Sequence, residues 1–437
     1  MFKFNFDVNG LTEEEGCGLA RDDDLIESTD QLNINGLEKE PSVDVDGQIV
    51  SRDCQEISID ELIDYVPPFI SYSTLRISTK HSIWKRDLYD AKFQSYLKDE
   101  EGALSESEQM FDPISSTSDL IPGIYEGGLK TWECSLDLAE VLVDGSFGKI
   151  KGHLLQSSND QKDCYPKTLR IFELGCGTGV PSILLLFKIF YELLSQDPKK
   201  PQQSTEPILQ IVLQDFNRDV LKLLTFPNIL LSYIYAKLLL TNDQKGNSNH
   251  DEPLDPTADL EISDDLKQEF KTFLRDNRID IRLIYGPWKA LYKSLPPTLS
   301  ADPSSQKKTV EDCNGSHDDD SDKQDEDEMV SQNGGTFDLI YSSETIYCLD
   351  SLDDLIELLI RCSKKPTQRG LLDDSRNLLV SSKVHYFGVG GGTNVFVRKI
   401  EKRNGTVKVV RSFNVESNDE RSNPLSGIAR IVMSIKF

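Results

Sequence analysis

Apolar residues recur along the chain in short continuous runs that alternate with stretches of helical spacing. The runs expected to be strands are Leu169–Leu174, Ile208–Gln214, Ile281–Tyr285, Phe337–Ser342 and Leu378–Ser381. The helical stretches are Leu136–Leu142, the residues after Gly179, the residues after Asn217, and Leu352–Cys362. Mostly apolar strands that are separated by crossover helices are typical of a parallel sheet covered on both faces. The pattern therefore predicts an α/β fold.

Further apolar segments flank this region on both sides. Gly405–Arg411 and Ile428–Ile435 are expected to pair as the final antiparallel strands. Upstream, apolar residues alternate over Ile70–Ile77, which predicts a short strand, and they recur at helical spacing over Trp84–Phe93. We expect this upstream segment to dock on the main domain.

The polar stretches suggest three parts. Residues 1–65 are rich in Asp, Glu, Asn and Ser, and are expected to be a mostly disordered tail, because they cannot bury enough apolar surface to offset chain entropy. Residues 66–124 are expected to form a docking segment and linker, and residues 125–437 the main domain. Polar insertions interrupt that domain near 242–263 and 294–335. The second is strongly acidic, which favours a solvated loop, with a loop that binds a basic partner as the alternative.

Composition restricts the classes of binding partner and the cellular compartment that we expect for this protein. The 437 residues include 48 Lys and Arg against 74 Asp and Glu, a formal net charge of −26, which disfavours nucleic acid and anionic membranes and favours a basic protein partner. The eight cysteines show neither a C-x-x-C pair nor a zinc spacing, so we expect no metal and reduced thiols in the cytoplasm or nucleus. No signal peptide is evident, and no apolar run approaches the ~20 residues that span a bilayer. We expect the protein to be a monomer.

The sequence Glu173-Leu174-Gly175-Cys176-Gly177-Thr178-Gly179 ends the first strand of the main domain. Glycine takes positive φ at low cost and lets the backbone approach a ligand closely. The order Glu-x-Gly-x-Gly-x-Gly differs from the G-x-G-x-x-G dinucleotide fingerprint. Its nearest match is the loop that holds S-adenosylmethionine, with Gly175 and Gly177 at the ligand; a strand-to-helix turn without a ligand is the alternative.

The second and third strands end in residues suited to the rest of an adenosine. In Gln214-Asp215-Phe216-Asn217, the carboxylate can accept hydrogen bonds from both ribose hydroxyls and Phe216 can cover the adenine. Asp215 lies 40 residues after Gly175, longer than the ~20 typical of this geometry, and an inserted loop at 196–206 accounts for the excess. Gly286-Pro287-Trp288 suits the adenine rim. The alternative for Asp215 is a residue that caps the next helix. The alternative for Gly286-Pro287-Trp288 is a hydrophobic corner.

The fourth strand ends in Ser343-Glu344-Thr345-Ile346-Tyr347. This turn places Glu344 and Tyr347 where they can face a reactive methyl group. A glutamate that caps the following helix is the alternative.

Together these segments resemble the eukaryotic protein-histidine N-methyltransferase family. The resemblance runs from about Trp84 to the C-terminus apart from the insertions, and is carried by Gly128–Ser135, Glu173–Gly179, Gln214–Asn217, Ser343–Tyr347 and Lys383–Gly392. It implies a Rossmann-like class I methyltransferase with a seven-stranded, mostly parallel sheet, S-adenosylmethionine as cofactor, and a histidine of the third large-subunit ribosomal protein as target. The residues that it implies contact the cofactor are Thr131, Trp132, Glu133, Cys134, Ser135, Gly175, Gln214, Asp215, Phe216, Gly286, Pro287, Trp288 and Ser343.

For catalysis, Glu344 is the first candidate to accept a hydrogen bond from the N–H of the target imidazole. Tyr347 is the candidate to form a wall beside the imidazole or to make a second hydrogen bond. His385 is a candidate proton relay, with a structural or substrate-contacting role as the alternative. The Glu-x-x-Tyr element is shared with lysine methyltransferases, so a lysine target stays open. A donor-binding assembly chaperone for a basic ribosomal protein also stays open, whereas the glycine spacing disfavours a dehydrogenase.

Overall fold

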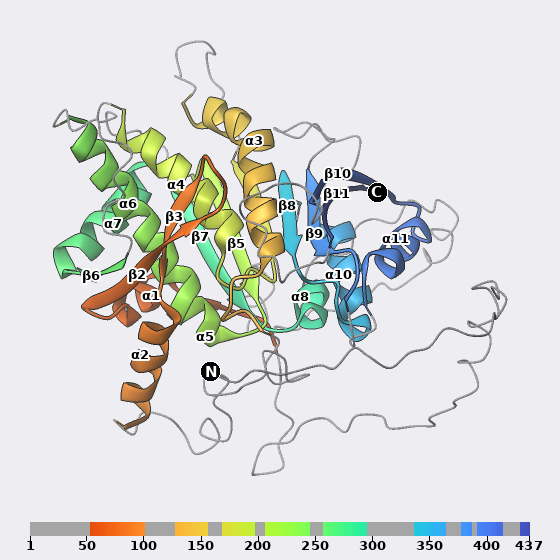
Figure 1. The fold of residues 1–437 in the computed structure, drawn as a ribbon, viewed down its shortest axis with the longest axis horizontal. Coiled ribbons are helices and arrows are strands. Elements are labelled where there is room, and N and C mark those ends of the chain that lie inside the picture. Colours follow the sequence, from red (N-terminus) through yellow and green to blue (C-terminus); the bar gives the residue numbers. More distant parts are fainter. Residues whose placement is uncertain are drawn as a thin grey trace, which may run out of the picture. The chain divides into compact units, whose positions relative to one another are not determined.

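The structure is a computed structural model that describes residues 53–100, 127–155, 168–196, 206–244, 257–294, 336–363, 377–386, 391–413 and 429–437. The predictions made for 1–52, 101–126, 245–256, 295–335 and 387–390 lie outside these ranges. The described residues form an eight-stranded sheet flanked by helices and a separate three-stranded sheet (Figure 1).

The strand order of the large sheet is β1-β7-β5-β4-β8-β9-β11-β10. Its strands are β1 (Gln55–Ile57), β4 (Leu169–Leu174), β5 (Leu209–Asp215), β7 (Ile279–Tyr285), β8 (Leu339–Ser343), β9 (Leu378–Lys383), β10 (Thr406–Phe413) and β11 (Arg430–Lys436). The five central strands pair in parallel, and β11 runs antiparallel to both β9 and β10. The predicted α/β class, the mostly parallel sheet and the terminal antiparallel pair are confirmed. The sheet has one strand more than the seven predicted, because β1 adds to the edge of β7.

Helices cover both faces of this sheet. Alternate residues of β4 belong to two different hydrophobic cores, Ile171 to one and Phe172 to the other. Since successive strand residues point to opposite faces, a strand buried on both faces is mostly apolar, and the buried Glu173 is the exception in β4. The first core includes residues of α3 (Glu133–Leu155), α4 (Val180–Leu194), α6 (Phe226–Gln244) and α7 (Asp264–Asp276); the second includes residues of α8 (Trp288–Ser294), α10 (Leu349–Cys362) and α11 (Thr393–Glu401).

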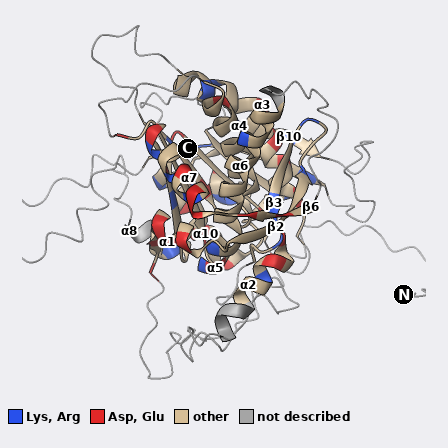
Figure 2. Cartoon of the chain, turned by 90° about the vertical axis from the view of Figure 1, so that its left-hand side faces the viewer, with Lys and Arg blue, Asp and Glu red and all other residues tan. Residues whose placement is uncertain are grey.

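The long apolar helical stretch after β5 lies inside the first core. It consists of α5 (Arg218–Val220), the π-helix η2 (Leu221–Thr225) and α6. By length and composition Arg218–Asn242 could cross a bilayer, but 72% of its apolar window is buried inside the protein, as in a core helix. In Figure 2 most of α6 carries no charge, whereas acidic and basic residues mark α7.

The small sheet is formed by β2 (Phe69–Arg76), β3 (Ser82–Arg86) and β6 (Thr257–Glu261), in the order β3-β2-β6. The Trp84 ring lies 4.1 Å from Tyr72 and 4.7 Å from Tyr235, so this sheet packs against α6. The strand predicted over Ile70–Ile77 is confirmed as β2.

The predicted helix over Trp84–Phe93 is wrong at its start. Trp84 pairs with Thr74 across the sheet, and helix α2 (Leu88–Glu100) begins only after β3. Aromatic side chains pack favourably against cross-strand neighbours, and in this short segment that packing outweighs the helical spacing of the apolar residues.

Three ordered elements lie in stretches that the sequence did not predict to be structured. β1 and α1 (Ile59–Tyr65) fall within the predicted tail, yet Leu62 and Ile63 are buried and belong to the first core. β6 falls within the predicted polar insertion near 242–263 and pairs with β2. The described fold therefore begins at residue 53 rather than at residue 66.

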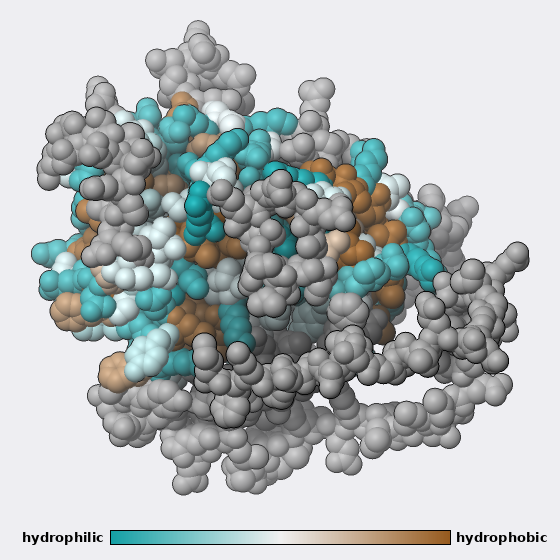
Figure 3. Space-filling model, in the orientation of Figure 1, coloured by the Kyte–Doolittle hydropathy of each residue, from teal (hydrophilic) through white to brown (hydrophobic). Residues whose placement is uncertain are grey.

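The surface seen in Figure 3 mixes hydrophilic and apolar residues. One apolar patch lies over β10 and β11, where Val409 is 59% exposed.

Candidate active site

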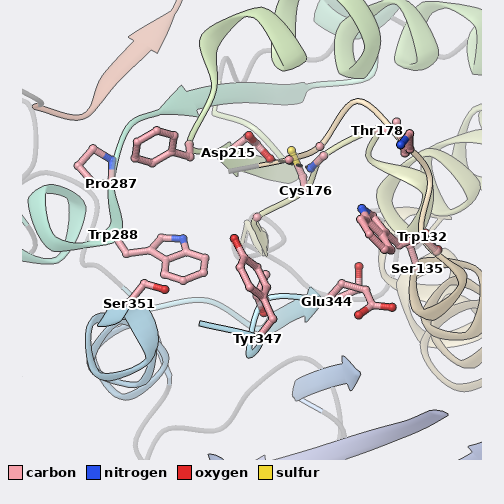
Figure 4. A pocket seen from close by; sticks show the side chains of 18 of the residues that line it. Trp132, Ser135, Cys176, Thr178, Asp215, Pro287, Trp288, Glu344, Tyr347 and Ser351 are labelled. Carbon is pink, nitrogen blue, oxygen red and sulfur yellow. Dashed lines mark hydrogen bonds between the residues drawn. The ribbon is translucent and has the colours of Figure 1, made fainter. Parts of the chain in front are cut away.

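A cavity of about 340 Å³ opens at the carboxyl ends of the central strands. In open α/β sheets this edge is where ligands bind. Figure 4 shows Trp288 and Tyr347 pointing into the cavity, with Trp132 on the other side and Glu344 below it. The residues that line it are Gly127, Gly128, Lys130, Trp132, Ser135, Gly175, Cys176, Gly177, Thr178, Asp215, Phe216, Gly286, Pro287, Trp288, Lys289, Ser343, Glu344, Thr345, Tyr347, Ser351, Asp354, Lys383 and Tyr386.

The glycine loop after β4 forms one wall of the cavity. Gly175 and Gly177 have φ values of 61° and 50°, in the left-handed region that favours glycine. A Cβ on Gly175 would lie 2.6 Å from Thr345 Cγ2, and one on Gly177 would lie 3.3 Å from Gly128 Cα. The loop thus has both the backbone conformation and the close packing that explain why glycine stands at these positions.

Gln214 joins three segments around the cavity. Its Nε2 donates to the Gly286 carbonyl at 2.8 Å, and its Oε1 accepts from Trp288 Nε1 at 2.8 Å and from Gly175 N at 3.3 Å. The side chain is buried and does not line the cavity. In this structure Gln214 holds the loops in place rather than facing a ligand.

Asp215 lies at the end of β5 and faces the glycine loop. Its Oδ2 accepts from Gly177 N at 2.8 Å and its Oδ1 from Asn217 N at 2.9 Å. Burial raises the pKa of Asp215 to about 6, opposed by hydrogen bonds from Asn217 and Gly177. The helix after β5 has Asn217 as its N-cap, so Asp215 is not the cap residue itself, although it binds the Asn217 amide. Oδ1 also accepts from Asn217 Nδ2 at 3.3 Å. Oδ2, which accepts from Gly177 N, therefore retains a lone pair for a hydroxyl donor.

The turn after β7 is supported by the edge strand. Gly286 has a φ of 124°, and a Cβ there would lie 3.0 Å from Cys54 Cα. The Cys54 thiol donates to the Pro287 carbonyl at 3.3 Å, and burial raises the pKa of that thiol to about 12, so it stays protonated. The segment that leads into β1 therefore fixes the turn that carries Trp288.

Glu344 and Tyr347 lie on the opposite side of the cavity from Asp215 (Figure 4). Glu344 has a φ of 56°, a left-handed conformation that costs on the order of 1 kcal/mol or more for a residue with a Cβ. The N-cap of α10 is Cys348, so Glu344 does not cap this helix. The strained backbone instead directs a carboxylate that is only 8% exposed toward the cavity.

Several predicted site residues do not line the cavity. Thr131 binds Thr178 through their hydroxyls at 3.1 Å, and Glu133 lies 3.5 Å from Lys383 Nζ. Cys134 is fully buried, and like Gln214 it lies behind the wall. The other predicted cofactor residues, together with Glu344 and Tyr347, do line it.

His385, the predicted proton relay, does not line the cavity. It is exposed and pairs with Gly392 in an isolated bridge. Lys383, the last residue of β9, and Tyr386, in the turn that follows, line the cavity instead.

The sequence did not single out Lys383 and Tyr386 as site residues. The Tyr386 hydroxyl donates to Glu344 Oε2 at 2.5 Å, and Lys383 Nζ lies 3.6 Å from Glu344 Oε1. Two sequence signals marked them, their place at the end of the fifth strand and their position in the Lys383–Gly392 segment that carries the family resemblance. Other unpredicted lining residues are Gly127, Gly128, Lys130, Cys176, Thr178, Lys289, Thr345, Ser351 and Asp354.

The cavity fits an adenosine-bearing methyl donor. Its volume is within the range of small-molecule sites, and its walls combine aromatic rings with a few polar groups. Asp215 and the glycine loop would hold the ribose, and Phe216, Pro287 and Trp288 would enclose the adenine. Among the described residues, no cluster of His, Cys, Asp and Glu could hold a metal ion.

Comparison with known proteins agrees with this geometry. The chain is 28% identical to Histidine protein methyltransferase 1 of Schizosaccharomyces pombe over 375 residues, 84% of each chain. It is 28% identical to the protein of that name in Saccharomyces cerevisiae, over 80% of this chain and 76% of the relative. It is 25% identical to the homolog from Rattus norvegicus, over 92% of this chain and 76% of the relative. These relatives confirm the resemblance predicted from the sequence, and support a protein-histidine methyltransferase with S-adenosylmethionine as cofactor.

Two solved structures that align with the chain are also methyltransferases. A precorrin-6Y C5,15-methyltransferase from Geobacter metallireducens has a TM-score of 0.26 at 9% identity, over 66% of this chain and 86% of its own. The rRNA methyltransferase AviRa from Streptomyces viridochromogenes has a TM-score of 0.25 at 10% identity, over 65% of this chain and 90% of its own. No protein-family model matches the chain.

Proposed function

We propose that this chain transfers a methyl group from S-adenosylmethionine to a ring nitrogen of a histidine in a protein, and that the protein is a large-subunit ribosomal protein, the third by family resemblance. The observation that carries the chemistry is the cavity itself. A glycine loop and Asp215 line one part of it, and Glu344 lies across from them. The relatives that share most of the chain are named for the same reaction.

The part of the cavity that is lined by Asp215, the glycine loop and Trp288 orients the methyl donor. When bound, S-adenosylmethionine supplies an activated methyl group on a sulfonium. Asp215 accepts a hydrogen bond from a ribose hydroxyl, the positive-φ glycines let the backbone approach, and Trp288 is held by its hydrogen bond to Gln214. Methyl transfer needs mainly an in-line approach and exclusion of water, which these walls provide.

The opposite part of the cavity, lined by Glu344 and Tyr347, presents the Glu344 carboxylate to the imidazole of the target histidine. A histidine with the unperturbed pKa of ~6.5 is mostly neutral at physiological pH, so its lone pair is available once the tautomer is fixed. Glu344 accepts the N–H of the nitrogen that is not methylated, which selects the tautomer and stabilises the positive charge that develops on the ring. Tyr347 forms a wall beside it (Figure 4).

The choice of a ribosomal substrate rests on the family resemblance and on charge. A chain with a formal net charge of −26 attracts a basic protein such as a ribosomal one. A ribosomal substrate would place the enzyme in the cytoplasm and nucleus, where ribosomal proteins are made and assembled. We propose that the enzyme acts as a monomer.

The test is methylation of a ribosomal precursor extract by the purified chain with labelled methyl donor. Peptide mass analysis should locate the label on one histidine of a large-subunit protein. Asp215→Ala should strongly lower labelling at a donor concentration near the wild-type Kd, with Asp276→Ala at the exposed end of α7 as the matched control. Label on lysine would assign the chain to the lysine methyltransferases of the same group. A variant that binds no donor yet still restores ribosome assembly would favour an assembly chaperone.

A further inference from the structure

The two oxygens of the Glu344 carboxylate have different environments. Oε2 accepts the Tyr386 hydroxyl at 2.5 Å. Oε1 has no hydrogen-bond partner among the residues that the structure describes, although the side chain is only 8% exposed. Buried carboxylate oxygens normally have partners, so an unpartnered one beside a cavity marks a place for a donor from a ligand.

Tyr386 is held as a donor toward Glu344. Burial and the neighbouring Glu344 carboxylate raise the pKa of Tyr386 well above its ordinary value, so the phenol keeps its proton. Its oxygen in turn accepts from Lys383 N at 3.3 Å, which fixes the direction of the hydroxyl. The hydrogen bond therefore occupies Oε2 and leaves Oε1 for another group.

Lys383 supplies a positive charge close to Oε1 without reaching it. Its ammonium lies 3.6 Å from Glu344 Oε1, 3.5 Å from Glu133 Oε2, and 4.6 Å from the centre of the Trp132 ring. A buried carboxylate is costly unless a charge or hydrogen bonds compensate it. The Cys134 thiol also lies beside the Glu344 carboxylate. Burial and the Glu344 charge raise the pKa of this thiol, so it stays protonated, but a thiol donates only a weak hydrogen bond.

We propose that Tyr386 and Lys383 are positioning residues for the methyl transfer, which hold the Glu344 carboxylate and turn its free Oε1 toward the N–H of the acceptor imidazole. This inference rests on the proposed function. In the reaction, the ring-nitrogen lone pair forms the N–CH3 bond as the S–CH3 bond breaks and leaves its electron pair on sulfur. The ring then carries one positive charge and two substituted nitrogens, and the proton that faces Oε1 leaves through Glu344 to water.

A double-mutant cycle separates this role from a structural one. Tyr386→Phe should lower kcat by about 10- to 100-fold, as expected for a hydrogen bond to a charged group, with the Kd of the methyl donor unchanged within about twofold. In a Glu344→Gln background the same change should have almost no further effect, because the carboxylate that it acts through is absent. Lys383→Met should behave in the same way, and Lys383→Arg should recover part of kcat.

The controls are conservative changes of the same kind far from the cavity. Tyr89→Phe on α2, where Tyr89 is 83% exposed, and Lys408→Met on β10 should keep wild-type kcat. Donor binding by calorimetry shows that each variant is folded. Fully additive losses in the cycle, or wild-type kcat in Tyr386→Phe, would overturn the inference. A wild-type chain that binds the donor but methylates no histidine would instead overturn the proposed function.

Discussion

The acid that precedes the glycine loop should make the stability of this protein fall as the pH rises. Glu173 is fully buried; its Oε2 accepts the Ser182 hydroxyl, and its Oε1 has no hydrogen-bond partner within the described part of the chain. Burial raises the pKa of Glu173 from 4.5 to about 8, and the bonds from Ser182 only partly oppose this. The folded protein therefore holds this side chain protonated at neutral pH.

The size of the effect follows from the two pKa values. Below pH 4.5 the carboxyl is protonated in both states and contributes no pH dependence. Between pH 4.5 and about 8 the unfolded chain loses the proton and the folded protein keeps it, so the free energy of unfolding falls by about 1.4 kcal/mol per pH unit. Above pH 8 the whole loss, about 5 kcal/mol, is present.

Glu173→Gln removes the titration and keeps the shape of the side chain. Urea unfolding of the wild type and the variant should show a stability difference that shifts in favour of the variant by about 4 kcal/mol between pH 5 and pH 9. Asp215, whose pKa is also raised, is present in both proteins, so its contribution cancels apart from its charge interaction with Glu173. Glu401→Gln at the exposed end of α11 is the control, expected to stay within about 0.5 kcal/mol of the wild type. A difference between Glu173→Gln and the wild type that is the same at both pH values would refute the reasoning.

Four further outcomes are expected at the cavity. Asp215→Ala should raise the Kd of the methyl donor about 10- to 100-fold by calorimetry, because a hydrogen bond to a charged acceptor is lost. In the wild type that Kd should rise as the pH is lowered through about 6, where Asp215 takes up its proton. Glu344→Gln should lower turnover about 100-fold in a methylation assay while donor Kd stays nearly unchanged. Gly175→Ala should weaken donor binding at least tenfold and lower the melting temperature, since its Cβ meets Thr345 at 2.6 Å and its φ is 61°.

The sequence predicted the central sheet well because burial on both faces leaves an unambiguous pattern. β4 has the predicted bounds, Leu169–Leu174, and the other central strands differ from their predicted bounds by one or two residues at an end. Short or half-exposed elements were missed. β1 has three residues and β6 alternates between exposed and half-buried positions, so neither forms an apolar run.

The candidate site was predicted only where a local motif marked it. The glycine loop, Asp215 and Glu344 each follow a recognisable strand. Tyr386 instead meets Glu344 across a separation of 42 residues, and its direction depends on how the chain turns after β9. The same turn leaves His385 exposed, which the sequence of neighbouring polar and aromatic residues could not reveal.

The edge position of β1 has a practical consequence for work with shortened forms of this protein. A polypeptide that starts at residue 66, where the sequence places the end of the disordered tail, would lack the three residues that pair with β7 from Leu283 to Tyr285. The backbone N–H and C=O groups of β7 would then be open to other molecules, as in edge strands that template aggregation. Insolubility of such a fragment would reflect an uncapped sheet together with the loss of Leu62 and Ile63 from the first core, and starting upstream of Asp53 should restore a well-behaved sample.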